Sequence, residues 1–148
     1  METQNNATKN LLSELYKNMK MGADAIINVS SKVGEGELRD ELARQLDTYE
    51  SFSKKIGMLL YELGDEPKED NPLSKFASKM GIAVNTLTDS SQSHIAQMMI
   101  EGATMGITEN TKLINRYEKK DVDPKALNLC RESVKFMEDS VEALKKFL

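Results

Sequence analysis

Residues 36–64, GELRDELARQLDTYESFSKKIGMLLYELG, carry one long amphipathic pattern that ends at a glycine. Apolar side chains recur every three or four residues, which is the spacing of one face of an α-helix. They are Leu38, Leu42, Leu46, Tyr49, Phe52, Ile56, Leu59, Leu60 and Leu63. Gly64 can adopt the left-handed conformation that closes a helix. The pattern therefore predicts a helix over residues 36–63 with one buried face.

The same periodicity predicts four further helices and no strand. They lie at about residues 6–33, 72–88, 91–119 and 124–147. Because the GEGE segment at 34–37 is short, the first two helices are expected to be antiparallel neighbours. Serines within residues 89–93, and Asp123 followed by Pro124, are residue types that start helices. The chain is therefore predicted to be all-α, with a hairpin, a crossover helix and a second hairpin in that order.

The length and charge of the chain exclude several classes of protein. A chain of 148 residues is expected to form one domain, 1–148, around a single core. Its 24 acidic and 20 basic residues are spread along the whole length, so no nucleic-acid partner is expected. No apolar run approaches the roughly 18 residues that cross a membrane, and METQNNATKN lacks the order of a signal peptide. We therefore expect a cytoplasmic protein that does not bind a membrane.

Cys130 is the only cysteine in the sequence. A single cysteine rules out an internal disulfide and any metal site built from several cysteines. We expect Cys130 to be a small buried apolar residue.

The order of the predicted helices is that of a ferritin-like bundle, in which one long connection joins two helical hairpins. Three segments, ELRDELARQLDTYESFSKKI at 37–56, LGDEP at 63–67 and HIAQMMIEGATMGITENTKLINRY at 94–117, carry the resemblance. With these segments the chain resembles an uncharacterised bacterial family of ferritin-like four-helix bundles. The resemblance covers nearly the whole chain and rests on element order and amphipathic spacing. It implies a ferritin-like four-helix bundle of two antiparallel hairpins with a short crossover helix.

Di-iron proteins of this fold hold two cations with inward-facing glutamates and with Glu-x-x-His on two of the helices. This chain has one histidine, His94, and Ser91 stands three residues before it. Most carboxylates of the predicted helices are expected to face outward, and only Glu109 is expected on an interior face. The carboxylates expected to face outward include Glu14, Asp24, Asp47, Glu50 and Glu132. We therefore expect a bundle that holds no metal and no cofactor.

An interior polar cluster of Gln45, Tyr49, Glu109 and His94 is the candidate site. Buried polar groups need hydrogen-bond partners, so these side chains are interpreted first as a structural cluster that fixes the helix register. The same groups can alternatively line a pocket for a small ligand. A metal-binding or redox protein that uses His94 and Glu109 is another alternative, with Met98 and Met105 as soft ligands.

Gly102 and Gly106 lie one turn apart in the predicted helix 91–119. Each glycine costs a helix interior about 1 kcal/mol relative to alanine. We therefore expect them to let another backbone pack closely. A second apolar row on the same helix needs a cover, which either the crossover helix or a second copy of the chain can supply. This second row consists of Ile100, Ala103, Ile107 and Ile114.

These observations favour a non-catalytic structural or interaction protein that forms a homo-oligomer, with a dimer expected. The protein partner cannot be named from the sequence. The first alternative is the metal-binding or redox protein described above. The second alternative is a binder of a small apolar ligand, held between the helices beside Gly102 and Gly106.

Overall fold

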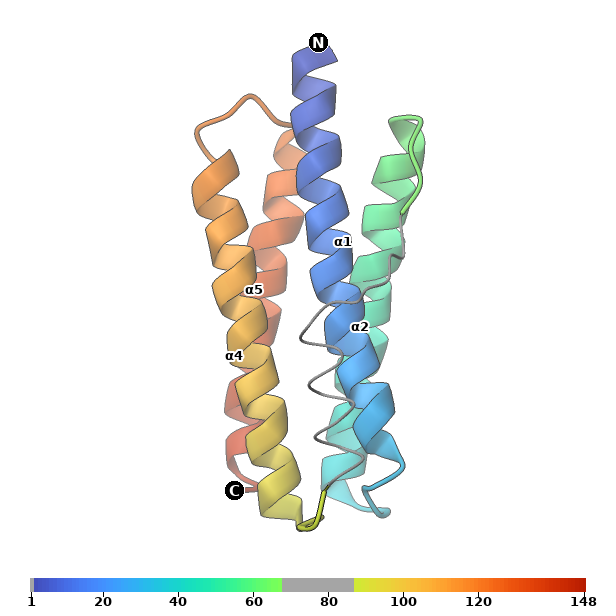
Figure 1. Ribbon diagram of the computed structural model, residues 1–148, viewed down its shortest axis with the longest axis vertical. Helices are drawn as coiled ribbons and strands as arrows, with labels where there is room; N and C mark the ends of the chain where they lie inside the picture. The colour runs from blue at the N-terminus through green and yellow to red at the C-terminus, as the bar shows by residue number, and fades with distance from the viewer. Residues whose placement is uncertain (1, 68–86) are drawn as a thin grey trace.

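The computed structural model describes residues 2–67 and 87–148. Four long α-helices run side by side: α1 (Glu2–Ser30), α2 (Glu37–Glu62), α4 (Gln92–Tyr117) and α5 (Pro124–Lys145) (Figure 1). α1 and α2 form one antiparallel hairpin, and α4 and α5 form the other. The prediction of an all-α four-helix bundle is confirmed. The helix predicted at 72–88 falls outside the described residues, apart from its last two residues, which are not helical.

The first hairpin turns at the glycines that the sequence singles out. α1 ends at Ser30, three residues earlier than predicted, and it begins at Glu2, four residues earlier than predicted. Gly36 has a φ of 147° and directly precedes α2, so the turn uses a conformation that other residues rarely adopt. Gly64 has a φ of 78°, which confirms the predicted left-handed stop after α2.

The helices of the second hairpin start at the predicted caps. Ser91 accepts a hydrogen bond from the backbone N–H of His94 at 3.2 Å, and this bond closes the first turn of α4. The Asp123 carboxylate accepts one from the backbone N–H of Lys125 at 2.9 Å, and Pro124 occupies the first turn of α5.

The core lies along the bundle axis between the two hairpins. α4 packs against α5 and α1, while α2 packs against α1 and α5, so the four helices enclose one interior. The predicted face of α2 is largely buried, with Leu38, Leu42, Tyr49, Phe52, Ile56 and Leu60 in the core. Cys130 is fully buried, as expected. The second apolar row of α4 is half-buried and packs against the core at Ile100, Ile107 and Ile114.

Two hydrogen bonds join the α4–α5 connection to the start of α1. Gln4 Nε2 donates to Asp121 Oδ1 at 3.0 Å. The backbone N–H of Asp123 donates to Thr8 Oγ1 at 2.9 Å, and Thr8 is buried. Figure 1 shows this connection beside the first turns of α1. We call these two bonds the terminal clip.

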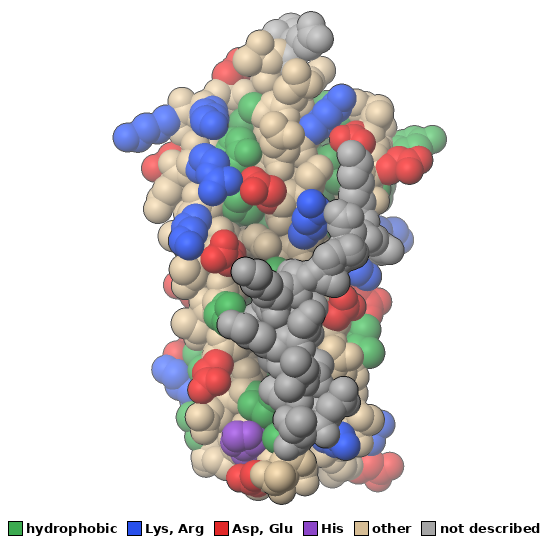
Figure 2. Space-filling view, viewed as in Figure 1, with side chains coloured by type: hydrophobic (Ala, Val, Ile, Leu, Met, Phe, Trp, Pro, Cys, Tyr) green, Lys and Arg blue, Asp and Glu red, His purple; other side chains and the backbone are tan. Residues whose placement is uncertain are grey.

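On the face shown in Figure 2, acidic and basic side chains are interleaved, and neither sign covers the surface. Among residues 2–67 and 87–148, no helix has the length and apolar character needed to cross a membrane.

Candidate functional site

Asn110 is the polar centre of the bundle interior, and its side chain is fully buried. Its Oδ1 accepts a hydrogen bond from Asn18 Nδ2 at 2.8 Å, and its Nδ2 donates to Ser133 Oγ at 2.9 Å. Ser133 Oγ in turn donates to the carbonyl oxygen of Cys130 at 2.6 Å, and Cys130 Sγ donates to the carbonyl oxygen of Asn110 at 3.4 Å. This network, the Asn110 cluster, joins α1, α4 and α5. In the described part of the chain, no fully buried side-chain nitrogen or oxygen lacks a partner.

The prediction that Glu109 faces the interior is wrong. Its side chain is 51% exposed and forms an ion pair with Lys112 at 3.4 Å. Asn110, the next residue, takes the inward direction because consecutive residues on an α-helix are rotated by about 100°. The buried face of α4 runs through Met99, Gly106, Asn110, Leu113 and Tyr117, at spacings of seven, four, three and four residues. That spacing is the signal that identifies Asn110 in the sequence.

The other predicted interior residues are not hydrogen-bonded to Glu109. Gln45 and Tyr49 are buried, as expected. Gln45 Nε2 donates to Glu41 Oε2 at 2.7 Å, on its own helix. His94 is half-buried in the first turn of α4, where its backbone is capped by Ser91.

The side chains that the structure describes do not supply the donor set of a dinuclear metal centre. In residues 2–67 and 87–148, no three His, Cys, Asp or Glu side chains come together to hold a cation. His94 and Glu109 are separated by about 22 Å along α4, and His94 and Met105 by about 16 Å, so neither pair can ligate one ion. Met98 is buried in the core. Burial raises the pKa of the Cys130 thiol to about 12, which disfavours the thiolate that metal binding requires.

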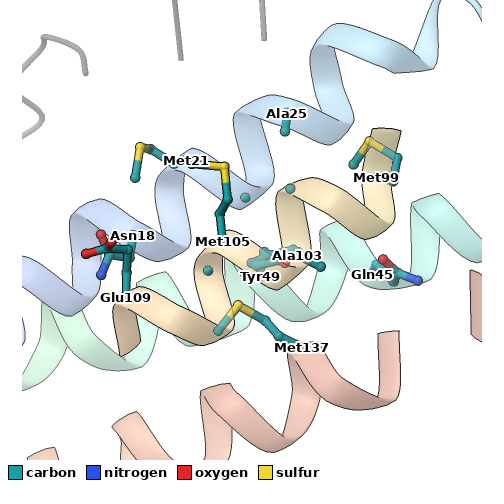
Figure 3. Close-up of a pocket in the computed structure, with 13 residues that line it drawn as sticks. Asn18, Met21, Ala25, Gln45, Tyr49, Met99, Ala103, Met105, Glu109 and Met137 are labelled. Carbon is teal, nitrogen blue, oxygen red and sulfur yellow. The ribbon is translucent and has the colours of Figure 1, made fainter. Parts of the chain in front are cut away.

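A cavity of about 200 Å³ lies between α1 and α4, and we call it the central cavity. Tyr49 of α2 and Met137 of α5 contribute to its wall (Figure 3). It is lined by Asn18, Met21, Gly22, Ala25, Gln45, Tyr49, Met99, Gly102, Ala103, Met105, Gly106, Glu109 and Met137. Figure 3 shows Asn18 and Glu109 at one end and Gln45 and Met99 toward the other. The cavity is therefore elongated along the bundle and mainly apolar.

Two glycines in the cavity wall admit neighbouring side chains. A Cβ atom on Gly22 would lie 2.4 Å from Cε1 of Tyr49, so the tyrosine ring needs glycine at this position. A Cβ atom on Gly106 would lie 2.6 Å from Sδ of Met137. The space beside Gly106 is therefore taken by a side chain, and the prediction that another backbone approaches there is wrong. Gly22 was not identified from the sequence, because its role depends on the Tyr49 ring of a different helix.

Tyr49 brings a buried hydroxyl to the cavity wall. Its side chain is 4% exposed, and its ring meets that of Phe136 edge-on, with centroids 4.8 Å apart. Burial raises the pKa of Tyr49 to about 12. Within the described part of the chain, the hydroxyl has no hydrogen-bond partner. It faces the cavity as an unused donor.

Residues 7–116 match the family described as Domain of unknown function (DUF2383). The chain belongs to this family. No curated protein matches the sequence.

Two solved structures share the fold. One is a dodecameric thioferritin, the bacterioferritin-related protein from Bacteroides fragilis, with a TM-score of 0.70 and 15% identity over 95% of this chain and 84% of that chain. The other is Dps from Thermosynechococcus elongatus, with a TM-score of 0.68 and 14% identity over 97% of this chain and 93% of that chain. At these identities the similarity establishes a ferritin-like fold alone.

Proposed function

We propose that this DUF2383 chain is a non-catalytic, self-associating structural protein, in which side-chain packing and amide hydrogen bonds organise the bundle interior. The observation that carries the proposal is the Asn110 cluster. Asn110 is fully buried and hydrogen-bonded to α1 and α5, whereas di-iron bundles of this fold line the interior with carboxylates. An amide is uncharged and suits a register-fixing role inside a bundle.

Self-association is supported by analogy with a relative. The thioferritin that shares the fold is dodecameric. In this chain, Met58 and Tyr61 are exposed one turn apart on α2, with exposed fractions of 58% and 77%. We take this pair of exposed apolar side chains as a candidate contact between copies of the chain. A homo-oligomer in the cytoplasm is part of the proposal, and the dimer is its simplest form.

The test is native mass spectrometry of protein purified without a histidine tag, combined with elemental analysis of the same sample. We expect one homo-oligomeric species whose mass is the sum of its chains, and an unfolding temperature that a chelator leaves unchanged. Iron, manganese or copper in stoichiometric amount contradicts the metal-independent role. A monomer at micromolar concentration contradicts the self-association.

A further inference from the structure

We propose that the central cavity binds a small, neutral ring compound that carries one hydrogen-bond acceptor. The inference goes beyond the proposed structural role, and it rests on the shape and chemistry of the cavity alone.

The cavity lies where small residues of α1 and α4 face one another. Gly22 and Ala25 lie on α1, and Gly102, Ala103 and Gly106 lie on α4. Protein interiors are packed as densely as organic crystals, and few voids larger than a water molecule survive in them. Glycine in a helix interior also destabilises the helix. The Tyr49 ring and Met137 fill the space beside Gly22 and Gly106, so Ala25, Gly102 and Ala103 are the small residues that leave room for a guest.

The size of the cavity limits the size of the guest. A cavity of about 150 Å³ in another protein accepts benzene, so one of about 200 Å³ holds roughly eight to ten non-hydrogen atoms. Within the described part of the chain, four thioether side chains face this space, from three different helices. They are Met21, Met99, Met105 and Met137. Methionine is flexible and polarisable, and its sulfur packs well against aromatic rings, so the wall can close around a ring.

The Tyr49 hydroxyl defines the polar contact. In the described part of the chain no fully buried side-chain oxygen lacks a partner, so the Tyr49 hydroxyl reaches the open space of the cavity, where water or a guest can bond to it. Tyr49 is held rigidly, with its ring against Gly22 on one side and Phe136 on another. A guest with a carbonyl or ether oxygen would accept the hydrogen bond that the protein leaves unmade. Because burial keeps this hydroxyl protonated, it acts as a donor across the physiological pH range.

The charges around the cavity favour a neutral guest. Among the residues that the structure describes, no lysine, arginine or histidine lines it, so these residues offer an anion no counter-ion. Glu109 stands at one end, and its negative charge repels a carboxylate or phosphate. Glu109 is already paired with Lys112 and is half-exposed, so it offers little to a cation that must leave water.

Three probes of the same size test the proposal: acetophenone, its hydrocarbon isostere α-methylstyrene, and benzoate. Each is titrated into the full chain labelled with 13C at the methionine methyl groups. We expect both neutral probes to shift the methyl signals of the four cavity methionines and to leave that of the exposed Met58 in place. We expect benzoate to shift none of them. Unmoved cavity signals with both neutral probes at millimolar concentration, or equal binding of benzoate, overturn the proposal.

Two variants with matched controls then test the geometry. Tyr49→Phe is expected to weaken acetophenone binding about fivefold and to leave α-methylstyrene binding unchanged, because only the ketone uses the hydroxyl. Tyr61→Phe, the same change at an exposed tyrosine, is expected to alter neither. Ala103→Leu fills the cavity and is expected to abolish binding of both probes, while Ala43→Leu on the exposed side of α2 is expected to preserve it. Undiminished acetophenone binding by folded Tyr49→Phe or Ala103→Leu protein overturns the proposal.

Discussion

Asn110 and Tyr49 are two polar side chains that are buried to almost the same extent, but they differ in what surrounds them. The Asn110 amide donates and accepts within a closed network on three helices. The Tyr49 hydroxyl lines a void and has no partner in the described part of the chain. A satisfied buried group stabilises one arrangement of the helices, whereas an unsatisfied group beside a void is free to bind a guest. The comparison separates the part of the interior that holds the fold from the part that can serve as a site.

The largest effect is expected from Asn110→Ala. This change removes hydrogen bonds to Asn18 and Ser133 and leaves a hole where the amide was, so the free energy of unfolding should fall by about 3 kcal/mol. Urea denaturation measures it. Asn115→Ala, at an exposed position on the same helix, is the control and should change the free energy by less than about 0.5 kcal/mol. Equal effects of the two changes would show that the Asn110 cluster does not hold the fold.

The next effect is the alkaline stability that Tyr49 controls. In the unfolded chain this tyrosine loses its proton near pH 10, but in the folded chain it does so near pH 12. The contribution of the protonated hydroxyl to the free energy of unfolding is therefore fully present below pH 10 and is lost as the pH rises. About 2 kcal/mol of the free energy of unfolding should be lost by pH 12. Burial also raises the pKa of Cys130, so this thiol lowers the free energy of unfolding at high pH in the wild type and in every variant alike.

Unfolding free energies of the wild type and of Tyr49→Phe, measured from pH 9 to pH 12, check this expectation. The variant should lose less stability over that range than the wild type, and Tyr61→Phe should behave as the wild type does. Parallel curves for the wild type and Tyr49→Phe would mean that the hydroxyl is solvated.

The smallest effect distinguishes Gly22 from Gly106, two of the glycines in the cavity wall. Gly22→Ala forces a Cβ against the Tyr49 ring, which is fixed on its other side, so the unfolding free energy should fall by about 1 to 2 kcal/mol. Gly106→Ala meets only the flexible end of Met137, and the gain in helix propensity offsets that contact, so the change should be near zero. Thermal unfolding of the two variants compares them directly. A larger loss for Gly106→Ala would reverse our view of which wall is rigid.

The sequence predicted the helices and their caps well, because these depend on local patterns. The face of α2 was predicted correctly since its apolar residues follow one clear stripe, and Ser91 and Asp123 cap as expected. α4 was harder, because apolar residues occur on two of its sides. The predicted inward face of α4 was therefore displaced by one residue from the observed one, and Glu109 was taken for the interior residue in place of Asn110.

The candidate site was predicted less completely than the fold. Six of the residues that were singled out line the cavity: Gln45, Tyr49, Gly102, Met105, Gly106 and Glu109. Gly22 was missed, because its role depends on the Tyr49 ring of a different helix. A cavity results from the distances between helices, and the pattern along one helix does not contain those distances.

The terminal clip has a consequence for the way the chain opens. The first turns of a helix usually fray, because their backbone N–H groups have no partners within the helix. Here Thr8 and Gln4 are bonded to residues more than a hundred positions away in sequence, beside the start of α5. The amino-terminal turns of α1 therefore open only together with the α4–α5 connection, and amide hydrogen exchange in the two segments should rise and fall as one unit.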